Sequence, residues 1–181
     1  DNISWQYQMQ NPMSSYLLML AIGHFEIQKE TSKSKIPLEN YYEKAFTNHV
    51  EPTYRYSTQI FNFLENEIGY NYPWQIYRQI PVHDFLYAGM ENTTSTLFST
   101  DFVVDSIGYF DRNYLNVNAH ELAHQWFGDR ITCGGWEHIW LNEGFATYLN
   151  ALCYYVDSPD LYWGIWKKNV LQKIIAKPDG S

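Results

Sequence analysis

The chain has 181 residues, of which 45% are hydrophobic and 18% are charged, a composition typical of a folded globular domain. Its formal net charge is −8 and it carries no basic stripe, which argues against nucleic acid as a partner. The longest apolar run, Tyr16–Ile22, is too short for a membrane span, and two cysteines, Cys133 and Cys153, cannot form a disulfide framework.

The two ends of the chain suggest that it is part of a longer protein. It begins with Asp1 instead of Met, and it stops at Ser181 directly after a helical pattern. We therefore expect the remaining domains of a longer chain to be partners of this segment.

In the first part of the chain, residues 15–29 form an apolar and then alternating pattern that predicts extended structure. Residues 31–35 are polar and indicate a linker or a turn. Apolar residues at spacings of three and four predict helix over residues 38–68, where Pro52 should divide the helix in two and Gly69 should end it.

Strands and then helices follow in the second part of the chain. The predicted strands cover residues 74–82, 94–99 and 102–104. The predicted helices cover residues 112–127, ended by Gly128, then 139–156, and finally 159–175, capped by Ser158. Strands that precede helices predict an α+β fold, with a mixed sheet covered by helices.

The residues with the clearest chemistry are His120-Glu121-Leu122-Ala123-His124. Residues i and i+4 share one face of a helix, so two imidazoles can bind one Zn²⁺. Glu121 points about 100° away from His120, where it can take a proton from a water without binding the metal. The alternative is an amphipathic helix whose histidines are only packed or capped.

A catalytic zinc site needs a third protein ligand, which must come from another segment. Glu143 opens the next helical pattern, 19 residues after His124, and two histidines with one glutamate form the ligand set of thermolysin-type enzymes. The metzincin pattern would instead require Gly and His where Phe127 and Arg130 stand, which excludes that class.

These motifs resemble the aminopeptidase N family of zinc metallopeptidases, the gluzincins that include leukotriene-hydrolase relatives. The first motif that shows this resemblance is His120-Glu121-x-x-His124 followed by eighteen residues and Glu143. The second is Ala88-Gly89-Met90-Glu91-Asn92, which resembles that family's G-A-M-E-N motif. The second motif departs from the family at its first two positions. The resemblance implies a thermolysin-like catalytic domain, truncated here before most of its helical lobe.

By the same resemblance, His120, His124 and Glu143 would bind one zinc ion and Glu121 would be the general base. Glu91, with Gly89, Met90 and Asn92, would bind the substrate, a peptide with a free N-terminus whose ammonium Glu91 would hold. Residues 1–36 would be the end of an N-terminal β domain with its linker, and residues 37–181 the first part of the catalytic domain.

The family's transition-state tyrosine is expected beyond Ser181, so we expect these 181 residues alone to be a weak or inactive aminopeptidase. Three alternatives stay open: an epoxide hydrolase like the leukotriene relatives, a non-catalytic zinc- and peptide-binding module, and a structural domain without zinc.

Overall fold

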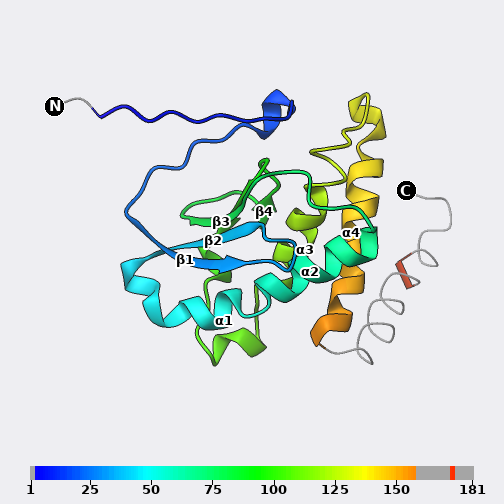
Figure 1. Cartoon of the computed structure of the whole chain (residues 1–181). Coiled ribbons are helices and arrows are strands. Elements are labelled where there is room, and N and C mark those ends of the chain that lie inside the picture. The colour runs from blue at the N-terminus through cyan, green and yellow to red at the C-terminus, as the bar shows by residue number, and fades with distance from the viewer. Residues whose placement is uncertain (1–2, 158–171, 174–181) are drawn as a thin grey trace.

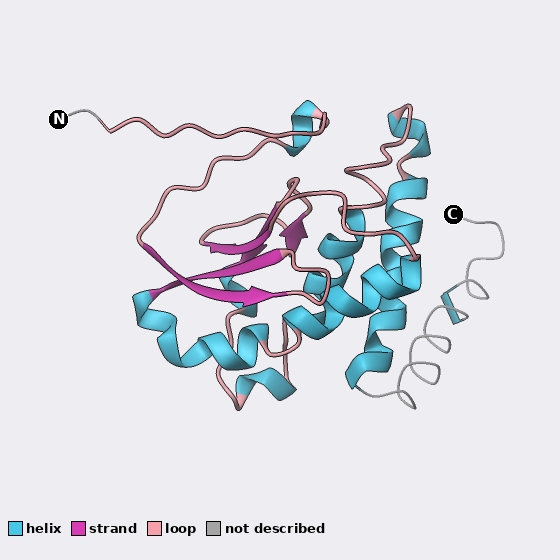
Figure 2. Ribbon diagram, viewed as in Figure 1, coloured by secondary structure: helices cyan, strands magenta, loops and turns pink. Residues whose placement is uncertain are grey.

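A computed structural model describes residues 3–157 and 172–173 of the chain (Figures 1 and 2). The strands are β1 (Phe25–Thr31), β2 (Pro37–Glu43), β3 (Tyr77–Val82), β4 (Gly89–Met90) and β5 (Ser95–Ser99). The α-helices are α1 (Val50–Tyr54), α2 (Ser57–Ile68), α3 (Leu115–His124) and α4 (Trp140–Asp157). Short 3-10 helices are η1 (Ser15–Leu17), η2 (Lys44–His49), η3 (Thr100–Phe102), η4 (Gly108–Phe110) and η5 (Trp136–His138).

The five strands form one mixed sheet in the order β1-β2-β3-β5-β4. The β2–β3 and β3–β5 pairs are parallel, whereas β1 pairs antiparallel with β2 and β4 pairs antiparallel with β5. The predicted α+β class is therefore confirmed. None of the helices in the described part of the chain is long and apolar enough to cross a membrane.

Helices α2, α3 and α4 pack against one another, and α3 also contacts β4 and β5 (Figure 1). The core between the sheet and these helices is rich in aromatic rings. Phe61 of α2 is fully buried, and its ring centroid lies 4.9 Å from that of Tyr72 and 6.4 Å from that of Trp126. The many aromatic residues of the sequence thus fill the layer on which α3 rests.

Buried amides connect α3 to the centre of the sheet. Asn118 of α3 hydrogen-bonds to the carboxamide of Gln79 on β3. The Gln79 Nε2 donates in turn to Asn40 Oδ1 on β2 at 2.7 Å and to Ser57 Oγ at 3.1 Å. Because an unpaired buried amide is costly, this network favours one position of α3 on the sheet.

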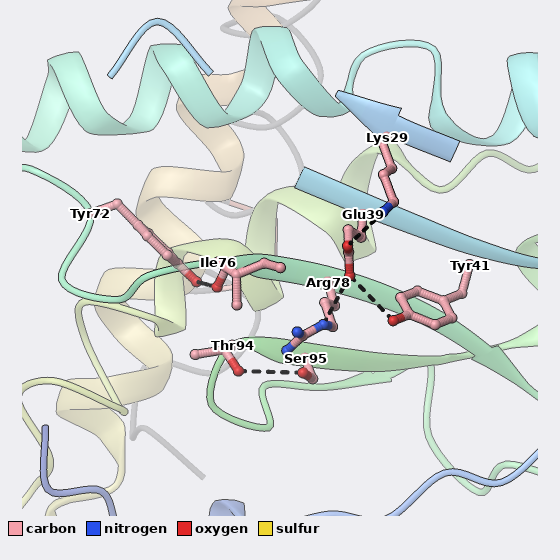
Figure 3. Close-up of polar contacts among 8 residues, drawn as sticks. All are labelled: Lys29, Glu39, Tyr41, Tyr72, Ile76, Arg78, Thr94 and Ser95. Carbon is pink, nitrogen blue, oxygen red and sulfur yellow. Dashed lines mark hydrogen bonds and ion pairs between the residues drawn. The ribbon is translucent and has the colours of Figure 1, made fainter. Parts of the chain in front are cut away.

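A second polar cluster ties the three strands β1, β2 and β3 together on a more exposed face (Figure 3). Glu39 of β2 accepts hydrogen bonds from Arg78 Nε at 3.1 Å and from the Tyr41 hydroxyl at 3.2 Å. Lys29 Nζ of β1 lies 3.8 Å from the other Glu39 oxygen. Cross-strand pairs of this kind support the register.

The helix predicted for residues 38–68 is right only in its later part. Residues 57–68 form α2, which ends at Gly69 in the left-handed conformation (φ 68°) as expected, and Pro52 lies inside the separate short helix α1. The prediction is wrong for residues 38–43, which form β2. Leu38 and Asn40 are both buried on one side of β2. Because Asn40 is polar, the sequence lacks the alternation of apolar and polar residues that identifies a strand.

Two other sequence predictions need correction. Residues 102–104 do not form a strand: η3 covers the first of them, and the Val104 amide donates to Thr53 Oγ1 at 3.1 Å. Within the predicted extended segment 15–29, residues 15–17 form η1 and only residues 25–29 belong to β1. The short strand β4 was not predicted.

The boundaries of the last helices are close to those expected. Helix α3 is shorter than the predicted 112–127, and α4 matches the predicted 139–156 within one residue. The predicted helix 159–175, with its cap Ser158, lies almost entirely outside the described residues. The division at residue 36 stays a prediction; β1, which precedes it, pairs with β2 over seven residue pairs.

Candidate active site

Helix α3 carries both histidines of the predicted metal site on one face. The Nε2 atoms of His120 and His124 lie 3.1 Å apart, and the two rings are nearly perpendicular, at 85°. His124 is 1% exposed and pairs its Nδ1 with the Phe127 carbonyl oxygen at 2.9 Å. Because a carbonyl can only accept, Nδ1 carries the proton and Nε2 is left to bind a metal.

Glu143 in the first turn of α4 completes the group. Its Oε2 lies 3.3 Å from His120 Nε2 and 3.7 Å from His124 Nε2. Helix α4 packs directly against α3, and the stacked rings of Phe127 and Phe145, 4.7 Å apart, support this contact near Glu143. The side chains that the sequence placed 19 residues apart therefore meet at one point.

The spacing of these three atoms fits a zinc ion. Ligands at the usual zinc bond lengths and in tetrahedral directions lie roughly 3.4 Å from one another. The three observed separations, 3.1, 3.3 and 3.7 Å, are close to that value. The residues present thus suit a tetrahedral metal with one open position.

The ionisation of the group also favours a cation. Hydrogen bonds from His120 and His124 hold the pKa of Glu143 far below its usual value. Burial lowers the pKa of His124, but the hydrogen bond to Glu143 and the nearby Glu91 and Glu121 outweigh it, so that this pKa rises to about 9. Without a metal, a proton on His124 therefore supplies part of the positive charge that this group of side chains favours.

Glu121 lies beside this group and is not one of the three converging side chains. One carboxylate oxygen of Glu121, one carboxylate oxygen of Glu91 and one ring nitrogen of His124 all lie within 4.8 Å of one another. The side chain is 6% exposed, and burial raises its pKa to about 8. A carboxylate next to, but outside, a metal's ligand set is positioned for proton transfer.

Residues of the Ala88–Asn92 motif reach the same place from the sheet. Gly89 of β4 lies so close to Glu121 that a Cβ on Gly89 would be 2.5 Å from Glu121 Oε1. Glu91 is 8% exposed. The Asn92 Nδ2 donates to the Leu17 carbonyl oxygen at 3.1 Å, and the Met90 backbone pairs with Leu97 of β5. Gly89 and Glu91 thus adjoin the metal group, whereas the amide of Asn92 holds the N-terminal segment.

Gln125 holds the loop that carries Glu91, and sequence reasoning missed it. Its fully buried side chain donates from Nε2 to the Glu91 carbonyl oxygen at 3.0 Å and accepts the Thr94 amide at 2.8 Å. Thr94 has a positive φ of 67°, which is strained for a β-branched residue. The only signal in the sequence was that Gln125 directly follows the second histidine.

Residues 53–178 match the Peptidase family M1 domain. The chain belongs to peptidase family M1. It is 31% identical to the glutamyl aminopeptidase of Sus scrofa over 173 residues, which are 93% of this chain and 18% of the relative. It is 32% identical to aminopeptidase N of Streptomyces lividans (84% of this chain, 19% of the relative) and 30% identical to aminopeptidase M1-C of Oryza sativa subsp. japonica (88% and 18%).

Membership of family M1 agrees with the geometry, because M1 is a metallopeptidase family and the converging side chains suit a metal ion. The predicted family resemblance is confirmed. The chain spans about a fifth of the length of the curated M1 relatives that it matches.

Proposed function

We propose that this chain carries the zinc site of an aminopeptidase, which hydrolyses the first peptide bond of a peptide with a free N-terminus. The observation that supports it most is the meeting of His120, His124 and Glu143 at zinc-like separations, with the carboxylates of Glu91 and Glu121 beside them. The names of the relatives, all aminopeptidases, agree with this proposal.

His120, His124 and Glu143 would hold the zinc ion. When bound, zinc polarises the substrate carbonyl and lowers the pKa of a water at the open position. Its positive charge would also favour the ionised form of Glu121, whose pKa burial otherwise raises to about 8.

Glu121 is the general base of the proposed reaction. Its carboxylate accepts a proton from the attacking water and then donates that proton to the amine of the leaving peptide. Burial of Glu121 keeps bulk water away from this proton, and the missing Cβ of Gly89 leaves room for the carboxylate.

Glu91 sets which bond is cut. A buried carboxylate close to the metal group pairs with the substrate's ammonium, and an ammonium fixed there leaves only the first peptide bond within reach of the metal. We expect the 181 residues alone to bind zinc but to be poor catalysts.

Replacing Glu121 by glutamine in the complete natural polypeptide tests the proposal. The shape of the side chain is kept and the base is lost, so we expect hydrolysis of leucyl-p-nitroanilide to fall roughly 10²–10⁴-fold while zinc content is unchanged. Glu137→Gln is the matched control, because that side chain is 75% exposed. A wild-type protein that binds zinc and cleaves no aminoacyl reporter would instead indicate a binding module.

A further inference from the structure

A short N-terminal segment, residues 14–17, lies against the candidate active site. Ser14 Oγ lies 3.3 Å from Thr132 Oγ1, in the loop after α3, and the Leu17 carbonyl oxygen accepts the hydrogen bond from Asn92. In Figure 1, η1 lies at the same end of the molecule as the beginning of α4, the helix that carries Glu143. The segment is thus held by two loops that flank the metal group.

Tyr16 is the residue at the middle of this segment. Its ring packs edge-on against Trp136, with centroids 5.1 Å apart at 68°. Its hydroxyl is inaccessible to solvent and has no hydrogen-bond partner among residues 3–157 and 172–173. A buried hydroxyl that the described residues leave unpaired is free to hydrogen-bond to a water or to a ligand.

The surroundings of that hydroxyl are negatively charged. Burial, together with the nearby Glu91, Asp129, Cys133 and Glu143, raises the pKa of Tyr16 to about 12. The phenol oxygen is therefore a neutral group beside the carboxylates of the proposed site. A phenol oxygen can accept a hydrogen bond as well as donate one.

Asp129 adds to the excess of acceptors. It is 3% exposed, and neither of its carboxylate oxygens has a hydrogen-bond partner at normal geometry in the described part of the chain. The Tyr16 hydroxyl and the Asp129 carboxyl are thus two buried polar groups to which a ligand that donates hydrogen bonds can bind.

We propose that Tyr16 is a substrate-binding residue, whose phenolic oxygen accepts a hydrogen bond from the α-ammonium that Glu91 binds. An ammonium has three N–H donors and no acceptor, which matches a group of acceptors better than water or a second metal does. This inference rests on the proposed aminopeptidase function, and it gives the N-terminal segment a direct part in recognising the free N-terminus.

The test is Tyr16→Phe in the complete natural polypeptide with zinc bound. Phenylalanine keeps the ring contact with Trp136 and removes only the hydroxyl. One lost hydrogen bond to a charged group should raise KM for leucyl-p-nitroanilide on the order of ten- to a hundredfold, with kcat and zinc content unchanged. Tyr7→Phe is the matched control, because Tyr7 lies in the same N-terminal region and is 80% exposed.

An unchanged KM in Tyr16→Phe would overturn the proposal, and so would a loss of kcat at constant KM, since that would place the hydroxyl at the reacting carbonyl.

If the wild-type protein cleaves nothing, the proposed function fails, and calorimetric titration with leucinamide still tests the role of Tyr16 in binding the ammonium. Weaker leucinamide binding by Tyr16→Phe, with N-acetyl-leucinamide not bound by either protein, supports it. Equal binding by both proteins, or no binding of leucinamide, overturns it.

Discussion

Replacing Gln125 by leucine removes the hydrogen bonds that hold the Glu91 loop on α3. The carboxamide of Gln125 pairs with the Glu91 carbonyl oxygen, the Thr94 amide and the Tyr72 hydroxyl, and it is fully buried. Leucine has a similar size, so the change leaves no large cavity and tests the hydrogen bonds themselves.

The expected cost follows from which groups lose their partners. Tyr72 can keep its second acceptor, the Ile76 carbonyl oxygen at 3.3 Å, so two buried backbone groups, at Glu91 and Thr94, are left unpaired. At about 1–3 kcal/mol for each unpaired group, the free energy of unfolding should fall by roughly 2–6 kcal/mol. For a domain of this size that is a fall in Tm on the order of 10 °C.

Thermal unfolding and amide hydrogen exchange measure the two parts of this prediction. The Thr94 amide, which bonds to Gln125 Oε1, should exchange roughly 30-fold faster or more in Gln125→Leu, even where global unfolding is slow. Gln75→Leu is the control, because Gln75 makes an exposed hydrogen bond with Gln10. A Tm equal to that of the control, with unchanged exchange at Thr94, would refute the reasoning.

Four further outcomes are expected. Below pH 9 the metal-free site binds a proton at His124, which zinc must displace. The apparent zinc affinity should therefore fall about tenfold for each unit by which the pH decreases. Calorimetric titrations at pH 6, 7 and 8 measure this affinity, and a pH-independent value would contradict the prediction. The same raised pKa gives the metal-free protein a stabilising contribution that is complete below pH 6.5 and lost as the pH rises through 9, so in EDTA its Tm should decrease over that range. Burial raises the pKa of the Cys153 thiol, so iodoacetamide should modify the partly exposed Cys133 and spare Cys153 in the native protein; peptide mass analysis checks this, and equal labelling would show that the thiol is not protected. Phe61→Ala should lower the free energy of unfolding by about 3–5 kcal/mol in urea titrations, because its ring is fully buried against Tyr72 and Trp126, whereas a loss below about 1 kcal/mol would mean that this core is loosely packed.

The sequence by itself determined the parts of the site that depend on local geometry. A spacing of four residues on one helix is enough to direct His120 and His124 to the same side, and Glu121 between them must then point elsewhere. The end of α2 at Gly69 was also a local matter, because glycine adopts the left-handed conformation at little cost. For these residues, neighbours along the chain decide the outcome.

Local patterns were insufficient where tertiary partners decide the conformation. Residues 38–43 contain Leu38 followed by tyrosines three and four positions later, yet they form β2 because Asn40 finds its partners in Gln79 of β3 and Gln28 of β1. The strand needs a buried polar position, and such a position is stable only when amides from other strands satisfy it.

The same reason explains the residues of the site that the sequence did not reveal. Gln125 is one more polar residue on a helix until the fold places the Glu91 carbonyl and the Thr94 amide against it. Tyr16 becomes a candidate only when η1 lies between Asn92 and Trp136. The metal-binding pattern was set by spacing along the chain, whereas the hydrogen-bonding groups around it were brought together only by packing of segments far apart in sequence.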